Sequence, residues 1–214
     1  MIKKMTYKEY ESEALRVINH FYTEPTSVPI DIEMTINRLN IDILPFKNLR
    51  NDFGAKGMIV RNASGGFDIV IDEDHWFSDD FYYQFTLAEE LAHLLVHTDL
   101  YKDAKSVCDI FKIQQRLSSD EYSMIEQQAR NIASYILFPR TSMTKYLLDW
   151  AELNHRQKSL GRFKTKTELG EYIINALSPK LETSTQVLKL TLLKRFPEPL
   201  LIDSIIQHLS LEVS

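Results

Sequence analysis

The sequence predicts an α+β fold, with a small antiparallel sheet in the N-terminal half and helices through most of the rest. Three observations carry this prediction. The 214 residues, of which 44% are hydrophobic and 26% charged, have the composition of an ordinary globular chain. Between residues 41 and 72 the apolar residues form short, β-branched runs typical of strands. From about residue 81 onward they recur at helical spacing instead.

The first segment alternates apolar and charged residues with a helical period over Tyr7 to Tyr22. A second, short helix is expected near Asp31 to Leu39. Asp31 is a suitable N-cap for this helix, because its carboxylate can accept a hydrogen bond from the first turn, and Asn40 is a suitable stop.

Three strand-like runs follow, namely Ile41–Leu44, Ala55–Arg61 and Phe67–Asp72. The last two flank Asn62–Gly66, whose Asn, Ser and Gly residues are typical of a hairpin connection. The sequence therefore predicts a small antiparallel sheet.

Two long helices are expected next, at Phe81–His97 and Glu121–Leu137, and Pro139 ends the second. Four shorter helices and a basic connector complete the chain: helices at Thr141–Leu153, Thr167–Leu177, Ser184–Arg195 and Leu200–Leu209, and the connector at Lys158–Lys166. We expect two regions, a domain at 1–140 and a helical C-terminal region at 141–214.

The net charge and the cysteine content limit the classes of binding partner and the cellular compartment that we expect. With a net charge of −5, the chain has no positive field that would attract nucleic acid, and four leucines make Thr183–Arg195 look like core instead of a DNA-reading helix. The single cysteine, Cys108, cannot form an intrachain disulfide, and the N-terminal residues lack a signal-peptide pattern. We expect a cytoplasmic protein with no membrane span.

The ionisable residues that could bind a metal or act in catalysis are concentrated on the helix at residues 81–97. Glu89, His93 and His97 are four residues apart, so they form a polar stripe on an otherwise apolar helix. Unpaired ionisable groups are costly to bury, so this stripe needs water, a salt partner or a cation. The string Glu89-Glu90-Leu91-Ala92-His93 differs by one residue from H-E-x-x-H, in which two His bind zinc and the Glu activates water.

Simpler interpretations remain open for the same residues. His97 can act as a charge at a helix C-terminus, where the dipole favours cations. Glu89 can pair with a lysine, and Glu126 can be a first-turn acid of its helix.

Two longer runs resemble one known family. The run 84–97, QFTLAEELAHLLVH, resembles the F-T-L-A-H-E-L-G-H-L-L-L-H signature of ImmA/IrrE-type metallopeptidases. The run 126–139, EQQARNIASYILFP, is similar to the E-x-x-A-N-x-F-A…L-M-P of the second helix in that family. The resemblance covers about residues 12–139.

The resemblance implies a zincin-like fold, in which a small sheet packs on an active-site helix and a second ligand helix. By position it implies Glu89, His93 and Glu126 as metal ligands and Glu90 as the general base. The implied cofactor is zinc, or manganese because carboxylate ligands tolerate it better. The implied reaction is hydrolysis of a peptide bond in a helix-turn-helix repressor, linked to transcriptional regulation of mobile elements.

Glu89 stands where the family has its first His ligand, and this departure opens alternatives. A site with one His and two Glu is a weaker Lewis acid, so slower hydrolysis is expected. Without a metal, Glu89 and Glu126 would face each other and would need a cation, an Arg or Lys, or a proton between them. The chain is then a pseudopeptidase that binds a protein without cutting it. A less favoured geometry uses His93, His97 and Glu126 as ligands and Glu89 as the base.

Overall fold

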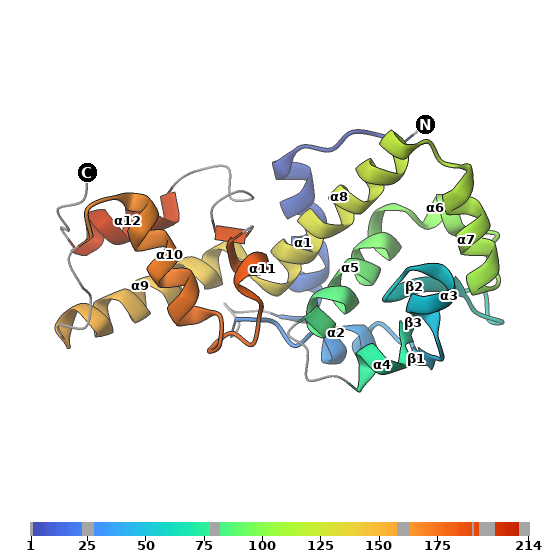
Figure 1. Cartoon of the computed structure of the whole chain (residues 1–214), viewed down its shortest axis with the longest axis horizontal. Coiled ribbons are helices and arrows are strands. Elements are labelled where there is room, and N and C mark those ends of the chain that lie inside the picture. The colour runs from blue at the N-terminus through green and yellow to red at the C-terminus, as the bar shows by residue number, and fades with distance from the viewer. Residues whose placement is uncertain are drawn as a thin grey trace. The chain divides into compact units, whose positions relative to one another are not determined.

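The computed structural model describes residues 2–22, 28–77, 82–157, 163–189, 191–192 and 200–209. Its helices are α1 (Tyr7–Phe21), α2 (Ile32–Arg38), α3 (Leu49–Phe53), α4 (Glu73–Trp76), α5 (Tyr82–Val96), α6 (Thr98–Tyr101), α7 (Val107–Arg116), α8 (Ser119–Leu137), α9 (Arg140–Arg156), α10 (Lys166–Leu177), α11 (Thr185–Lys189) and α12 (Leu200–Leu209). Its strands are β1 (Ile43–Phe46), β2 (Gly57–Arg61) and β3 (Phe67–Asp72). The α+β fold class is thereby confirmed (Figure 1).

The three strands form one sheet in the order β1-β3-β2 within the described residues. β2 and β3 pair antiparallel, with Ile59 opposite Ile69, as the hairpin prediction requires. β1 pairs parallel to β3, so the sheet is mixed and not antiparallel throughout. The reason is that the chain reverses direction twice, once through α3 between β1 and β2 and once in the hairpin between β2 and β3, so β1 and β3 run the same way.

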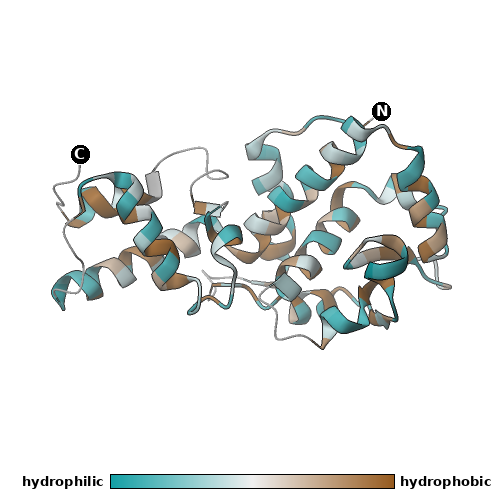
Figure 2. Ribbon diagram, viewed as in Figure 1, coloured by the Kyte–Doolittle hydropathy of each residue, from teal (hydrophilic) through white to brown (hydrophobic). Residues whose placement is uncertain are grey.

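Helix α5 is the central helix of the first part of the chain. It packs against α8 on one side and against β2 and β3 on the other, and α8 also packs against α1 (Figure 1). Most of these helices carry both hydrophilic and hydrophobic stretches, as Figure 2 shows. In α5 all residues from Phe85 to His93 except Glu89 are buried, which is expected of a helix covered on two sides.

The local signals at the element ends agree with the structure. Asp31 caps α2 by accepting from the Met34 amide at 2.9 Å, and Asn40 follows the helix with a positive φ of 55°. At the start of α1, Thr6 and Glu9 form a reciprocal capping box. In the hairpin, Gly65 has a φ of 89°, which L-residues with side chains rarely adopt.

The chain divides into two compact units. The first comprises Met1–Thr23 and Asp31–Leu137, and the second comprises Glu24–Ile30 and Phe138–Ser214. Within the second, α9 packs against α12, and α10 packs against both α11 and α12. Of the predicted elements here, residues 158–162 of the basic connector and parts of Ser184–Arg195 lie outside the described residues.

None of the helices described in the structure is both long and apolar enough to cross a membrane.

Candidate functional site

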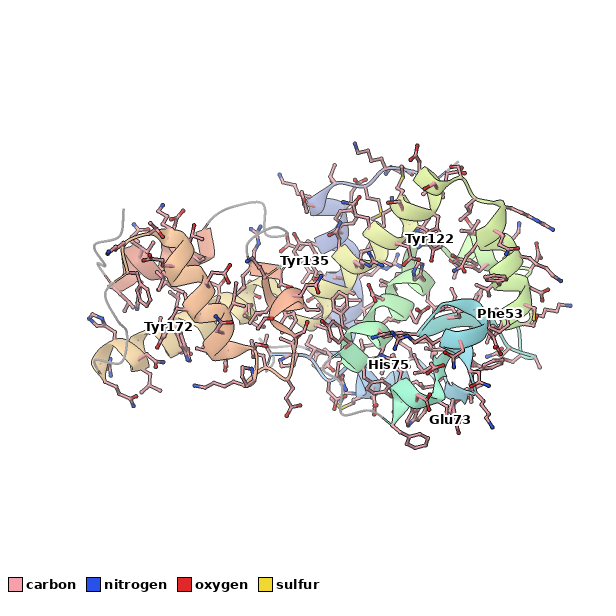
Figure 3. All side chains as sticks on the ribbon, viewed as in Figure 1. Phe53, Glu73, His75, Tyr122, Tyr135 and Tyr172 are labelled. Atoms are coloured by element: carbon pink, nitrogen blue, oxygen red, sulfur yellow. The ribbon has the colours of Figure 1, made fainter. Side chains whose placement is uncertain are left out.

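A cavity of about 390 Å³ opens in the first unit beside α5. Its walls come from β2, α5, α6, α7 and α8 and from the segment between α3 and β2. Phe53 and Tyr122, both labelled in Figure 3, line it from α3 and α8. The four residues that the resemblance selected, Glu89, Glu90, His93 and Glu126, all line this one cavity.

The packing of α5 explains this convergence. Leu87, Ala88, Leu91 and Ala92 are almost completely buried in the core of the unit. Glu89, Glu90 and His93 lie one turn apart or adjacent on the helix, so the same packing holds all three at the cavity.

Glu90 is buried against strand β2. Its side chain fits because residue 57 is glycine: a Cβ there would lie 2.9 Å from Glu90 Cγ and 3.0 Å from Thr86 Cγ2. Burial raises the pKa of Glu90 well above 4.5, and the negative charges of Glu126 and Glu89 raise it further. Burial and the neighbouring carboxylates thus favour the protonated form of Glu90, which can donate a hydrogen bond.

A guanidinium group lies between two of the predicted metal ligands. Arg130 Nε donates to Glu89 Oε1 at 3.1 Å, and a terminal nitrogen of the same group lies 3.5 Å from Glu126 Oε2. Glu126 and Arg130 are one turn apart on α8, whereas Glu89 comes from α5. The Arg130 side chain is 54% exposed, so it enters this cluster from the solvent side.

His93 is buried and lies 3.6 Å, measured from Nε2, from Glu126 Oε1. Its other ring nitrogen, Nδ1, is 3.0 Å from His97 Nδ1, and His97 Nε2 is 2.9 Å from Gln128 Oε1. Burial lowers the pKa of His93 to about 3, assisted by His97 and by the charge of Arg130. Burial also lowers the pKa of His97.

These contacts bear on the two roles considered for His97, as a metal ligand and as a charged group at the end of the helix. Both ring nitrogens of His97 are engaged, one by His93 and one by Gln128, so the geometry with His97 as a ligand is not favoured. Burial lowers the pKa of His97, which disfavours a charged ring at the end of the helix.

As arranged, the donor set does not fit a metal ion. Two of its three members are ion-paired with Arg130, and their oxygens face a guanidinium. Within the described ranges, no three His, Cys, Asp or Glu side chains are arranged to hold a metal ion. The assignment of Glu89, His93 and Glu126 as ligands therefore stays a prediction.

Two further residues of the cavity were not singled out from the sequence. One is Arg130, although it lies inside the quoted run at the position where the family pattern has Asn. The other is Tyr101, which is buried in the cavity wall with its ring at 74° to that of His93. No motif contains Tyr101, so only the fold could reveal it.

The chain matches one family model, described as the IrrE N-terminal-like domain (Peptidase_M78), over residues 69–192, which is more than half of its length. No curated protein is detectably similar to it in sequence.

Proposed function

Since the chain belongs to the IrrE N-terminal-like family, a zinc-dependent metallopeptidase type, we propose that it is a pseudopeptidase. Its cleft binds a segment of a protein, and Arg130 takes the place of the metal ion. The observation that carries the proposal is the bridge from one guanidinium to Glu89 and Glu126, at 3.1 Å and 3.5 Å.

The chemistry of the bridge accounts for the loss of hydrolysis. Two carboxylates that face each other need a cation, and Arg130 supplies that charge. A guanidinium, however, has only N–H donors and no open coordination position, so it cannot bind a water molecule and lower its pKa as zinc does. Stability is not its main contribution, because half-exposed ion pairs are worth about 0–1 kcal/mol.

Strand β2 supplies a surface for the bound segment. It is at one edge of the sheet, and its residues Gly57, Met58 and Ile59 line the cavity. The Arg61 amide donates to Ala104 and not to β3, so by the alternation of an antiparallel pair the backbone groups of Gly57 and Ile59 also face away from β3. An extended segment can add to such an edge through main-chain hydrogen bonds.

The family resemblance suggests that the partner is a helix-turn-helix repressor. We expect such a repressor to co-elute with the protein in size-exclusion chromatography and to keep its intact mass after prolonged incubation with zinc. A repressor that is cut by the native protein, but not by Glu90→Gln, would overturn the pseudopeptidase proposal. It would establish instead the hydrolytic alternative, with Glu90 as general base and metal held by Glu89, His93 and Glu126.

Metal content provides the sharper test. Elemental analysis after dialysis against zinc should find far less than one zinc per chain in the native protein. The double variant Glu89→His with Arg130→Asn restores the family pattern and removes the bridging cation, so about one zinc per chain is expected.

The matched control combines Glu89→His with Arg156→Asn. Arg156 also pairs with a glutamate one turn away, Glu152, but on α9 in the other unit. This control should bind much less zinc than the rebuilt variant. Stoichiometric, tight zinc binding by the native chain would contradict the proposal.

A further inference from the structure

A chain of hydrogen bonds runs from His93, in the cavity wall, to the N-terminal segment. His93 Nδ1 contacts His97 Nδ1, and His97 Nε2 contacts Gln128 Oε1. Gln128 Nε2 in turn donates to the backbone carbonyl of Lys3 at 2.6 Å. His93, His97 and Gln128 are all buried, so these groups have little water to bond to instead.

The donor and the acceptor of each hydrogen bond can be worked out from the Lys3 end of the chain of bonds. A backbone carbonyl only accepts, so the amide NH₂ of Gln128 faces Lys3 and its oxygen faces His97. An amide oxygen also only accepts, so the proton of His97 is on Nε2. A neutral imidazole carries one N–H, which leaves His97 Nδ1 as the acceptor.

The last step fixes which ring nitrogen of His93 carries the proton. Because His97 Nδ1 accepts, His93 Nδ1 must carry the proton and donate it. Neither nitrogen of His97 contacts a carboxylate within the described residues, because one faces His93 and the other faces the Gln128 amide oxygen. His93 Nε2 is 3.6 Å from Glu126 Oε1, which is beyond hydrogen-bond distance, so each ring carries a single N–H. His93 Nε2 then has no proton, and its lone pair faces the cavity.

We propose that His97 and Gln128 are positioning residues that hold His93 as the Nδ1–H tautomer, with the Nε2 lone pair directed at the cavity. His93 Nε2, 3.6 Å from Glu126 Oε1, is thereby an acceptor beside a carboxyl group. It attracts a cation, a protonated carboxyl group or an N–H of a bound peptide. This inference does not depend on the proposed function, because the same tautomer serves a binding cleft and a metal site.

The direct test is nitrogen NMR of protein labelled with ¹⁵N-histidine, with the His93 signals assigned by their absence in His93→Asn. In the native protein at pH 7.5, Nδ1 of His93 should carry the proton and Nε2 should not. A proton found on His93 Nε2 would overturn the proposal.

Gln128→Met tests the origin of the preference. Methionine is close to glutamine in length but cannot orient His97, so we expect His93 to become a mixture of tautomers. Gln127→Met is the matched control, because Gln127 is the neighbouring residue on the same helix and is less buried. An unchanged tautomer in Gln128→Met, with the fold intact by circular dichroism, would contradict the role of Gln128.

A second measurement links the tautomer to ligand binding. In the rebuilt variant with Glu89→His and Arg130→Asn, adding Gln128→Met should weaken zinc binding by about 10–100-fold, the usual effect of removing a group that orients a metal-bound His. Adding Gln127→Met should not. If the rebuilt variant takes up no zinc, the proposed function fails, whereas the tautomer is still decided by the NMR spectrum.

Discussion

Two polar clusters that meet at α5, a cavity face and a rear relay, satisfy their buried or partly buried groups in different ways. The cavity face, formed by Glu89, Glu90, Glu126 and Arg130, uses opposite charges and a raised carboxyl pKa. The rear relay, formed by His93, His97, Gln128 and the Lys3 carbonyl, uses neutral, directional hydrogen bonds in a buried setting. The cavity face differs from the family pattern at residues 89 and 130. Its charged residues can be replaced with little loss of folding stability. A relay in which each proton fixes the next is far less tolerant.

The largest effect is expected from His97→Leu, which breaks the relay. It leaves His93 Nδ1–H and Gln128 Oε1 unpaired in the interior, so the free energy of unfolding should fall by about 2–6 kcal/mol, given about 1–3 kcal/mol for each buried unpaired group. Urea denaturation at pH 7.5 measures this, with Gln127→Leu as control. A loss below that of the control would show that the relay is not structural.

Gly57→Ala tests how tightly the cavity face is packed. The new Cβ would lie 2.9 Å from Glu90 Cγ, so overpacking should cost about 1–3 kcal/mol. In a double-mutant cycle with Glu90→Ala, which removes the opposing side chain, most of that cost should disappear. Strictly additive effects would mean that the two residues do not touch.

Glu90→Gln should stabilise the protein, and increasingly so as the pH rises. The pKa of Glu90 in the fold lies above its ordinary value of 4.5, so folding takes up a proton. Above pH 4.5 the native protein therefore loses stability with rising pH until the pKa in the fold is passed, by about 1.4 kcal/mol for each tenfold difference in proton affinity. Glutamine has no such dependence. Denaturation at pH 5, 6.5 and 8 should show the gain growing, and a gain that is constant with pH would refute this explanation.

The smallest change in stability is expected from Arg130→Gln. Because the arginine is 54% exposed, its ion pairs should contribute less than about 1 kcal/mol at moderate salt. Thermal unfolding at low and high ionic strength measures this, and the difference should shrink as salt is added. A loss comparable to that of His97→Leu would place Arg130 among the structural residues and erase the contrast between the two clusters.

The sequence predicts much of the fold because the hydrophobic period of a long segment indicates its secondary structure. The helices α5 and α8 and the strands β2 and β3 appear within a few residues of their predicted limits. The short helices α3 and α6 span little more than one turn, too little for any periodicity to emerge. The parallel pairing of β1 depends on the strand order, which no local pattern encodes.

The candidate site is predicted only in part. The resemblance, which the family match confirms, selected Glu89, Glu90, His93 and Glu126, and the fold brings all four to one cavity. Charge balance required a cation, an Arg or Lys, or a proton between the carboxylates, without saying which of these is present. Arg130 could have been found from the sequence, since it is one turn after Glu126 on the same helix. The bond from Gln128 to Lys3 spans 125 residues, so it follows from the tertiary structure alone.

The contact between Gln128 and Lys3 gives the beginning of the chain an influence on a distant imidazole. A change in the backbone at Lys3 that displaces this carbonyl would therefore loosen the proton order behind the cleft, although Lys3 itself does not line the cavity.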